Sequence, residues 1–336
     1  MHRPLLLRGA RQLLTLRGAQ GPRRGAACLD LGVIHEGSVL IRNGRIFSVG
    51  PSRRIDNLAE ARNATVHECG GAVVMPAFID ARLTLPPNLA SAHKVLDLAF
   101  FHGSGTIATV APYSPLRALS QSRIHSHLVT TLDLEASLDK LQLQRAIRQE
   151  LAAFLRIDMN SHTPASLRYI RSLGAALRLY SSNSSHADWL GLSLAYGASI
   201  VEVDRSLTAA QIALLAESTA CGVLTPGEAA RARALVDAGA AVALGSGFAA
   251  NGGGTCSMQA ATVLACREGD LDIAEAICLS TLNAAHALGV ASQRGSIETG
   301  KVADLLVLHV SDFHDLANFT GVNVVSKCIR IGTLVS

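Results

Sequence analysis

The sequence predicts an α/β fold in which a (β/α)8 TIM-like barrel is joined to a small β-sandwich domain formed by both termini. In the middle of the chain, apolar runs typical of strands alternate with amphipathic helical stretches, whereas both ends show strand and turn patterns. The chain has 336 residues, of which 49% are hydrophobic, so it can bury one large core. We expect residues 1–71 and 297–336 to form the sandwich and residues 72–296 to form the barrel.

The two ends of the chain share a strand-and-turn character. Asn43-Gly44 lies between two apolar runs, and this dipeptide is a strong hairpin signal because both residues accept a positive φ. Near the other end, Gly332 separates two further runs and predicts a second hairpin. The β-like runs cover residues 5–7, 12–16, 38–41, 45–49, 303–308, 325–331 and 333–335.

The middle of the chain contains eight predicted strands with helices between them. Thr163-Pro164 predicts the start of one helix, and Gly174 and Gly239 follow the ends of two others. The predicted strands cover residues 72–82, 106–112, 124–132, 154–158, 176–181, 199–204, 222–225 and 241–245. The predicted helices cover residues 134–153, 164–173, 187–196, 209–218 and 228–238. Eight units favour a closed barrel over an open doubly wound sheet, and a barrel places its chemistry at the C-terminal ends of its strands.

Composition and charge argue against several classes of partner. The formal net charge is +4, but no stretch interleaves basic and aromatic residues, so we expect no nucleic-acid partner. No apolar run approaches the ~18–20 residues of a membrane span, and the run Leu5–Leu7 is too short for a signal-peptide core. The seven cysteines are scattered and form no CxxC pair. This pattern favours reduced thiols, so we expect a cytoplasmic protein without a membrane partner.

Four motifs follow one another along the chain: GSVLIRNGRIFSVGP, VVMPAFIDA, STLNAAHALG and GSIETGKVADLLVL. Together they resemble the amidohydrolase superfamily, and more narrowly its imidazolonepropionase-like members. The resemblance extends over nearly the whole chain and is weakest between Leu85 and Asn160, where this chain is also shorter. It implies a hydrolase that opens a cyclic-amide C–N bond in histidine degradation. Relatives are commonly dimers, so it also implies a homodimer.

The resemblance further implies a zinc or iron ion that turns bound water into hydroxide and polarises the carbonyl under attack. Its ligands would come from four strand ends, beginning with a His-x-His pair directly after Asp80-Ala81. The matched positions of this chain hold Arg82, Thr84, Tyr180, Val203 and Gly247. None of these residues can do the work of the family ligand. We therefore predict that the family's zinc or iron is absent, and we assign no catalytic residue.

Polar residues nevertheless gather at the predicted strand ends. The candidate pocket consists of Arg82, Thr84, Tyr180, Glu202, Val203 and Gly247. Three further acids follow neighbouring strands: Asp133, Asp158 and Asp204. A guanidinium stays protonated and offers no acceptor lone pair, so Arg82 would repel a metal ion. We hypothesise that Arg82 replaces part of the metal's positive charge and forms an ion pair with Glu202.

The histidines give weaker signals. His125-Ser126-His127 is the only HxH motif, but it lies at the start of a predicted strand, which is the barrel bottom, where residues usually serve stability. We expect His186 to cap a helix or lie on the surface. His286 is expected to pack within a helix, and His102 lies where a helix ends.

Two other motifs are incomplete. The stretch Leu244-Gly245-Ser246-Gly247 lacks the spacing of a nucleophile elbow. The glycine-rich turn 252–254 before Thr255 has backbone N–H groups that suit an anion, but it lacks the lysine of a phosphate loop. Cys256 lies close to a helix start, which lowers the pKa of a thiol, yet no partner base is evident.

Three functional hypotheses stay open at this point. We favour a catalytically degenerate member of the family, a pseudoenzyme that binds a small cyclic or anionic ligand, a second copy of the chain, or both. The first alternative is an active hydrolase with a rearranged or metal-free site. The second alternative is a non-enzymatic ligand-binding or interaction protein.

Overall fold

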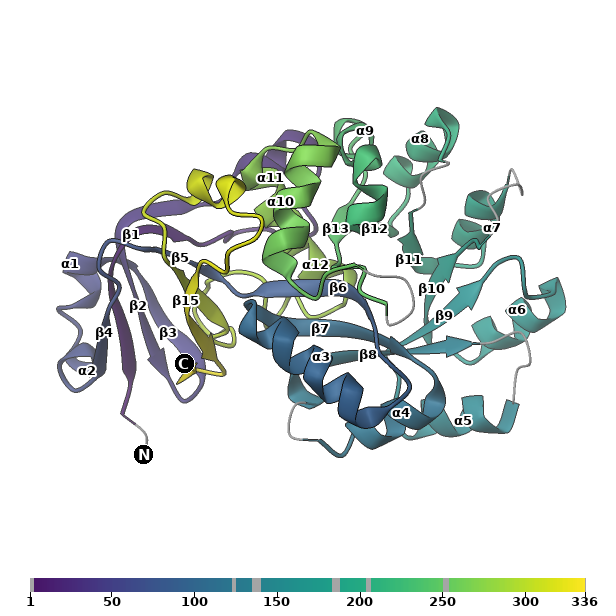
Figure 1. The fold of residues 1–336 in the computed structure, drawn as a ribbon, viewed down its shortest axis with the longest axis horizontal. Helices are drawn as coiled ribbons and strands as arrows, with labels where there is room; N and C mark the ends of the chain where they lie inside the picture. The colour runs from purple at the N-terminus through teal and green to yellow at the C-terminus, as the bar shows by residue number, and fades with distance from the viewer. Residues whose placement is uncertain are drawn as a thin grey trace.

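The computed structural model describes residues 3–122, 125–134, 140–182, 188–203, 207–249 and 254–335. Figure 1 shows two sheets side by side, one built from both ends of the chain and one from its middle. The second sheet consists of eight parallel strands surrounded by helices. The predicted fold class is therefore confirmed.

The terminal sheet joins strands from both ends of the chain in the order β16-β15-β14-β5-β1-β2-β3, and β4 pairs with β1. Its strands are β1 (Leu5–Leu14), β2 (Val33–Arg42), β3 (Arg45–Pro51), β4 (Thr65–Glu68), β5 (Val73–Pro76), β14 (Leu305–Leu308), β15 (Val325–Arg330) and β16 (Thr333–Val335). Asn43 and Gly44 have φ values of 52° and 77°, as the predicted hairpin between β2 and β3 requires.

The terminal sheet buries both of its faces. Leu13, Val74 and Leu305 lie in one apolar cluster, although they come from opposite ends of the chain. Leu6 and Leu40 lie on the opposite face, against the short helices α1 (Ser52–Ile55) and α2 (Ala59–Arg62). Apolar side chains of β1 thus enter two different buried clusters, as expected for a strand that is covered on both faces.

The barrel sheet consists of β6 (Phe78–Thr84), β7 (Ser104–Ala111), β8 (Leu128–Leu134), β9 (Phe154–Asp158), β10 (Ala176–Tyr180), β11 (Ala198–Glu202), β12 (Cys221–Leu224) and β13 (Val242–Leu244). Every neighbouring pair is parallel. Two backbone hydrogen bonds connect the last strand segment to the first: Gly247 N–H donates to Arg82 O over 3.0 Å, and Thr84 N–H donates to Phe248 O over 2.8 Å.

Helices cover the outside of this barrel. They are α3 (Leu89–Phe101), α4 (Tyr113–Leu119), α5 (Lys140–Arg148), α6 (Pro164–Ser172), α7 (Trp189–Ala195), α8 (Ala209–Glu217), α9 (Ala232–Asp237), α10 (Met258–Gly269), α11 (Ile273–Leu279) and α12 (Leu282–Ala287). The predicted start of α6 is confirmed, because the Thr163 hydroxyl accepts a hydrogen bond from Ser166 N–H. In the described part of the chain, no helix is both long enough and apolar enough to cross a membrane.

Two local predictions were wrong. The expected strand 72–82 is divided between the two sheets, since Ala77 N–H donates to Asp304 O and Phe78 N–H donates to Gly103 O. Apolar periodicity could not reveal this change of partner, because the chain is buried on both sides of it. His125–His127 form a short 3₁₀ turn before β8 and are not part of that strand.

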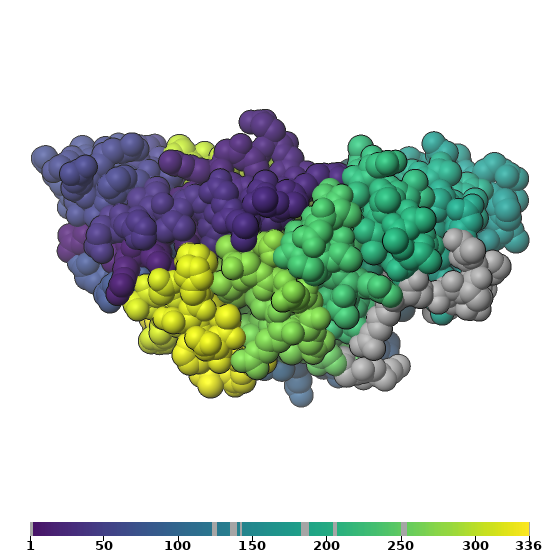
Figure 2. Space-filling view, turned by 90° about the horizontal axis from the view of Figure 1, so that it is seen from above, coloured from purple at the N-terminus to yellow at the C-terminus, as the bar shows by residue number. Residues whose placement is uncertain are grey.

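The segment after β1 runs along the barrel flank. In Figure 2 the N-terminal residues lie against the green helices of the barrel. The Arg24 guanidinium donates hydrogen bonds to the carbonyls of Ala216 and Ser218, at the end of α8, and of Gly239, after α9. The N-terminal segment therefore links the terminal sheet to the outer surface of the barrel. The division into folding units at residues 71 and 297 stays a prediction.

Candidate functional site

Five barrel strands bring charged side chains together inside the barrel, from the middle of β9 and β10 and from the C-terminal ends of the other three strands. They are Arg82 from β6, Asp133 from β8, Arg156 from β9, Arg178 from β10 and Glu202 from β11. In the sheet register, Arg156 lies beside both Asp133 and Arg178. Side chains alternate along a strand, so these residues face the inside of the barrel while their neighbours face the helices.

Glu202 is the centre of this network and is only 3% exposed. Its Oε1 accepts hydrogen bonds from Arg156 Nε at 2.8 Å and from Arg178 Nε at 2.5 Å. Its Oε2 accepts a hydrogen bond from Arg156 Nη2 at 2.9 Å, and Arg82 Nε lies 3.3 Å from the same oxygen. The hypothesised pair of Arg82 and Glu202 is therefore present. Burial acts to raise the pKa of Glu202, but the three guanidiniums outweigh it and hold the pKa well below its ordinary value.

Arg156 connects Glu202 to the rim of the barrel. Its Nη1 donates to both carboxylate oxygens of Asp133, each at 3.1 Å. Its guanidinium carbon lies 3.7 Å from the centre of the Tyr180 ring, a cation–π distance. Burial acts to lower the pKa of Arg156, but Glu202 and Asp133 outweigh it and raise the pKa. Burial raises the pKa of Tyr180, so its phenol stays neutral.

Arg178 and Arg82 keep N–H groups without a partner. Arg178 is fully buried, and its Nη1 donates to Ala81 O at 2.7 Å. Its Nη2 has no hydrogen-bond partner among the described residues. The Arg82 side chain is 25% exposed, and its ion pair with Glu202 is the one interaction found for it in the described ranges.

Asp80 lies behind this network. Its Oδ1 accepts hydrogen bonds from the backbone N–H groups of Arg82 at 3.0 Å and Ser246 at 2.8 Å. Its Oδ2 is buried without a partner among the described residues. Burial raises the pKa of Asp80 to about 6, although the hydrogen bonds from Ser246 and Arg82 and the charge of Arg178 act in the opposite direction.

The comparisons with known proteins agree with this geometry. The family profile "Amidohydrolase family" matches residues 159–335. The chain is 30% identical to an imidazolonepropionase of Geobacillus kaustophilus, over 99% of this chain and 98% of that protein. It is 31% identical to an imidazolonepropionase of Deinococcus radiodurans, over 97% and 98%. The chain belongs to the amidohydrolase family. Within it, the chain is imidazolonepropionase-like.

Solved structures support the fold of this amidohydrolase. A guanine deaminase of E. coli has a TM-score of 0.77 at 16% identity, covering 100% of this chain and 99% of that one. An adenosine deaminase of Xanthomonas campestris, solved with bound zinc, has a TM-score of 0.78 at 18% identity, covering 98% and 92%. At such identities the likeness concerns the fold alone.

Three of the predicted pocket residues of this amidohydrolase lie outside the charged network. Thr84 and Gly247 form the seam between β6 and the segment after β13. Gly247 has a φ of 69°, and a Cβ there would lie 2.7 Å from Thr225 Cβ, so no larger side chain fits. Val203 is buried in the apolar cluster between the barrel and its helices. Of the six predicted pocket residues, Arg82, Tyr180 and Glu202 share the charged network.

The remaining polar candidates lie apart from the network. Asp158 accepts hydrogen bonds from Asn160, Ser161 and Ser182, which together outweigh burial and lower its pKa. His127 is buried at the barrel bottom, where its Nδ1 lies 2.9 Å from Gly105 O. His186, Asp204 and residues 252–253 lie outside the described residues, as does the side chain of His125.

The site of this amidohydrolase does not fit a divalent metal ion. Three guanidiniums, which have no lone pair to give, converge where the family resemblance places the ligands. No group of three or more His, Cys, Asp or Glu side chains that could hold an ion exists within the described ranges. The absence of zinc or iron itself stays a prediction.

Sequence reasoning missed Arg156 and Arg178. Both lie in the middle of correctly predicted strands, two residues before Asp158 and Tyr180, which were predicted as strand-end residues. Strand alternation was the available signal, because a residue two positions before an inward residue also points inward. A barrel interior is usually filled by branched apolar side chains, which is why charged residues were not expected there.

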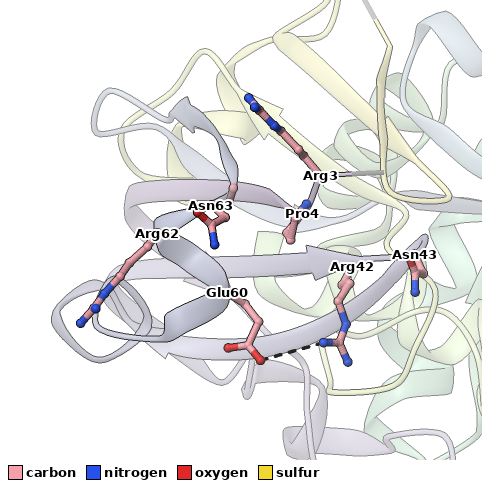
Figure 3. Close-up of a pocket in the computed structure, with 8 residues that line it drawn as sticks. Arg3, Pro4, Arg42, Asn43, Glu60, Arg62 and Asn63 are labelled. Atoms are coloured by element: carbon pink, nitrogen blue, oxygen red, sulfur yellow. Dashed lines mark ion pairs between the residues drawn. The ribbon is translucent and has the colours of Figure 1, made fainter. Parts of the chain in front are cut away.

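A hollow of about 740 Å³ lies on the terminal sheet, away from the barrel mouth. Figure 3 shows the residues that line it. Its lining residues are Arg3, Pro4, Arg42, Asn43, Glu60, Arg62, Asn63 and Ala64. Arg42 Nη1 and Glu60 Oε1 are 3.9 Å apart, and both side chains are largely exposed. Arg62 points away from this pair in the figure. Exposed, diverging charges of this kind offer no preorganised site.

Proposed function

We propose that this amidohydrolase is a catalytically degenerate, imidazolonepropionase-like protein that does not carry out metal-dependent opening of a cyclic amide. One observation carries the proposal: Arg82, Arg156 and Arg178 surround Glu202 at the barrel mouth. A metal-dependent member of the family would need a cation at this end of the barrel. Here the protein supplies its own fixed cations.

Electrostatics argue against a divalent ion beside these residues. At ~4 Å and an effective dielectric constant of about 20, two unit charges repel by about 4 kcal/mol, and a divalent ion doubles this value. Glu202 is the nearest carboxylate that could offset the repulsion. Both of its oxygens already interact with guanidiniums.

The described part of the network also offers no suitable general base for activating water without a metal. A base must accept a proton near neutral pH. The pKa values of Glu202 and Asp158 are lowered, so both remain ionised and hydrogen-bonded. Asp80 has a pKa of about 6, but it is fully buried and its Oδ1 is held by two backbone N–H groups. The alternative of an active hydrolase with a rearranged site therefore receives less support than degeneration.

The test combines metal analysis with an activity assay. Protein purified without chelators is analysed for zinc and iron by mass spectrometry and is then incubated with a cyclic imidazolone amide. We expect substoichiometric metal and no hydrolysis above the uncatalysed rate, before and after zinc is added. The imidazolonepropionase of Geobacillus kaustophilus, treated identically, is the positive control. Stoichiometric metal together with turnover that a chelator abolishes would refute the proposal.

We also propose a cytoplasmic location and a homodimer. All seven cysteines are free thiols in the structure, which supports a reducing compartment. The dimer rests on the family resemblance alone. Sedimentation analysis of the purified chain should give twice the monomer mass of 35.1 kDa, and a single species of monomer mass would contradict it.

A further inference from the structure

We propose that the barrel mouth binds one small carboxylate, which Arg82 holds. The inference rests on the proposed function, because a resident metal ion would compete with Arg82 for the same place.

Among the described residues that form ion pairs at the mouth, positive charges outnumber negative charges by one. Three guanidiniums, those of Arg82, Arg156 and Arg178, face two carboxylates, those of Glu202 and Asp133. Glu202 is almost fully buried, as are Arg156 and Arg178, so solvent screens these charges poorly. A buried charge that has no counter-charge is unfavourable, and an anion at the mouth would correct the balance.

The central carboxylate of the network has no room for another strong donor. Each Glu202 oxygen already faces two guanidinium nitrogens, which uses the acceptor positions of the carboxylate. Both oxygens of Asp133 accept from Arg156 Nη1. Meanwhile Arg178 Nη2 is buried without a partner in the described structure, and Arg82 places no Nη hydrogen bond within it. The donors exceed the acceptors.

In the described structure, the other nearby acids do not accept hydrogen bonds from these unpaired guanidinium N–H groups. Asp158 is surrounded by the hydroxyl, amide and N–H groups of Asn160, Ser161 and Ser182. Asp80 accepts from two backbone N–H groups. Neither forms an ion pair with a guanidinium in the described parts of the chain. Their charges lower the potential at the mouth, but they leave the end of the Arg82 guanidinium free.

The chemistry of the free group selects the ligand. A guanidinium is a planar fork of donors that matches a carboxylate through two parallel hydrogen bonds. Arg82 is 25% exposed at the end of β6, and the neighbouring Asp133 is 31% exposed, so a ligand can approach from the mouth. A monoanion balances the single excess charge, whereas doubly charged phosphate would exceed it. The ligand class is therefore a small monocarboxylate.

The experiment measures thermal unfolding and binding heat with sodium formate, acetate and propionate at constant ionic strength, where sodium chloride replaces the carboxylate. We expect a saturable rise in the unfolding temperature of the unaltered protein with the carboxylates. Arg82→Gln should abolish the rise, and Arg82→Lys should weaken binding about tenfold or more because the planar fork is lost. Arg117→Gln, at an exposed position on α4, is the matched control and should behave like the unaltered protein.

If Arg82 served only to stabilise the fold, Arg82→Gln would lower the unfolding temperature of the ligand-free protein. The proposal expects the opposite: with Gln at position 82, the remaining two guanidiniums balance the two carboxylates, so the ligand-free variant should unfold at or above the temperature of the unaltered protein. An absent or unsaturable carboxylate effect overturns the inference, as does an equal effect in Arg82→Gln or an equal effect of chloride or inorganic phosphate. Zinc or iron is measured in the same samples. A missing carboxylate response in metal-free protein refutes this inference alone, whereas stoichiometric metal refutes the proposed function.

Discussion

A single carboxylate holds the charged interior of the barrel together. Glu202 is the shared partner of Arg82, Arg156 and Arg178; Arg178 is fully buried and Arg156 is only 9% exposed. Removal of one member of a buried ionic network leaves its partners uncompensated, which costs more than the network contributes as a whole. Glu202 is therefore the residue on which the stability of the mouth depends most.

Glu202→Gln should destabilise the protein by about 3–5 kcal/mol, because three guanidiniums lose their common counter-charge. Urea unfolding followed by circular dichroism measures the change. Glu217→Gln, at an exposed position on α8, is the control and should change the free energy of unfolding by less than about 0.5 kcal/mol. Equal effects of the two substitutions would show that the network is not the source of the loss.

Asp80 and Glu202 should give opposite pH dependences. The pKa of Asp80 is raised from 3.8 to about 6 by burial, so its stabilising contribution is present below pH 4 and is lost as pH rises through 6. The free energy of unfolding of Asp80→Asn should therefore rise by about 2 kcal/mol relative to that of the unaltered protein between pH 4 and pH 7. The pKa of Glu202 is lowered, so its contribution is present above its ordinary value of 4.5 and is lost as pH falls.

Urea unfolding of the Asp80→Asn variant at a series of pH values tests the sign. Asp97→Asn, at an exposed position on α3, serves as the control and should give a pH-independent difference. A difference between Asp80→Asn and the unaltered protein that stays constant from pH 4 to pH 7 would contradict the raised pKa.

The sequence identified residues of the charged network where the end of a predicted strand coincided with a position that the family resemblance makes informative. Arg82 and Glu202 were identified because both lie at strand ends that the family resemblance makes informative, and the structure places them 3.3 Å apart. Arg156 and Arg178 were missed because an acidic partner on a nearby strand decides whether their charge can be buried. That partner comes from another strand, and no local pattern encodes it.

The elements themselves were largely predictable, because eight apolar runs separated by capped helices correspond to the eight barrel strands. The seam between the last and first strands could not be predicted, because it depends on how closely the backbones of these two strands approach each other. A Cβ at Gly245 would lie 2.6 Å from Arg82 N and 2.8 Å from Arg82 Cβ. The glycine there lets β13 and β6 meet where Arg82 enters the barrel.

Gly245→Ala should destabilise the protein by about 1–3 kcal/mol, because the added methyl group forces the seam apart. Thermal unfolding measures the effect. Gly21→Ala is the matched control, since nothing lies within 4 Å of a Cβ at that position and its φ is not in the left-handed range. A neutral Gly245→Ala would mean that the seam adjusts without cost.

At the scale of the whole molecule, Asn283 connects the N-terminal segment to the barrel. Its Oδ1 accepts from Arg23 N–H at 2.8 Å, while its Nδ2 donates to Arg23 O at 2.8 Å and to Val242 O at 2.9 Å. The side chain is fully buried, so each of these groups would lose its partner without contact to water. One amide thus joins α12, β13 and the segment that leads from the terminal sheet.

Asn283→Ala should lower the free energy of unfolding by about 2–4 kcal/mol, because three buried polar groups lose their hydrogen bonds. Limited proteolysis of the segment around Arg23 should accelerate in parallel. Asn57→Ala is the control: its amide donates one exposed hydrogen bond to Arg53 O, so its effect should stay near zero. An unchanged cleavage rate in Asn283→Ala would show that the segment is held elsewhere.

The change of sheet at Ala77 has a consequence for synthesis on the ribosome. β5 ends at Pro76 and pairs with β14, which begins at Leu305, so residues 77–304 must be synthesised before this edge finds its neighbour. Until then the hydrophobic face of the early hairpin is uncovered and open to self-association. Newly made chains should therefore need chaperones while these residues are synthesised, and truncation before residue 305 should leave them aggregated.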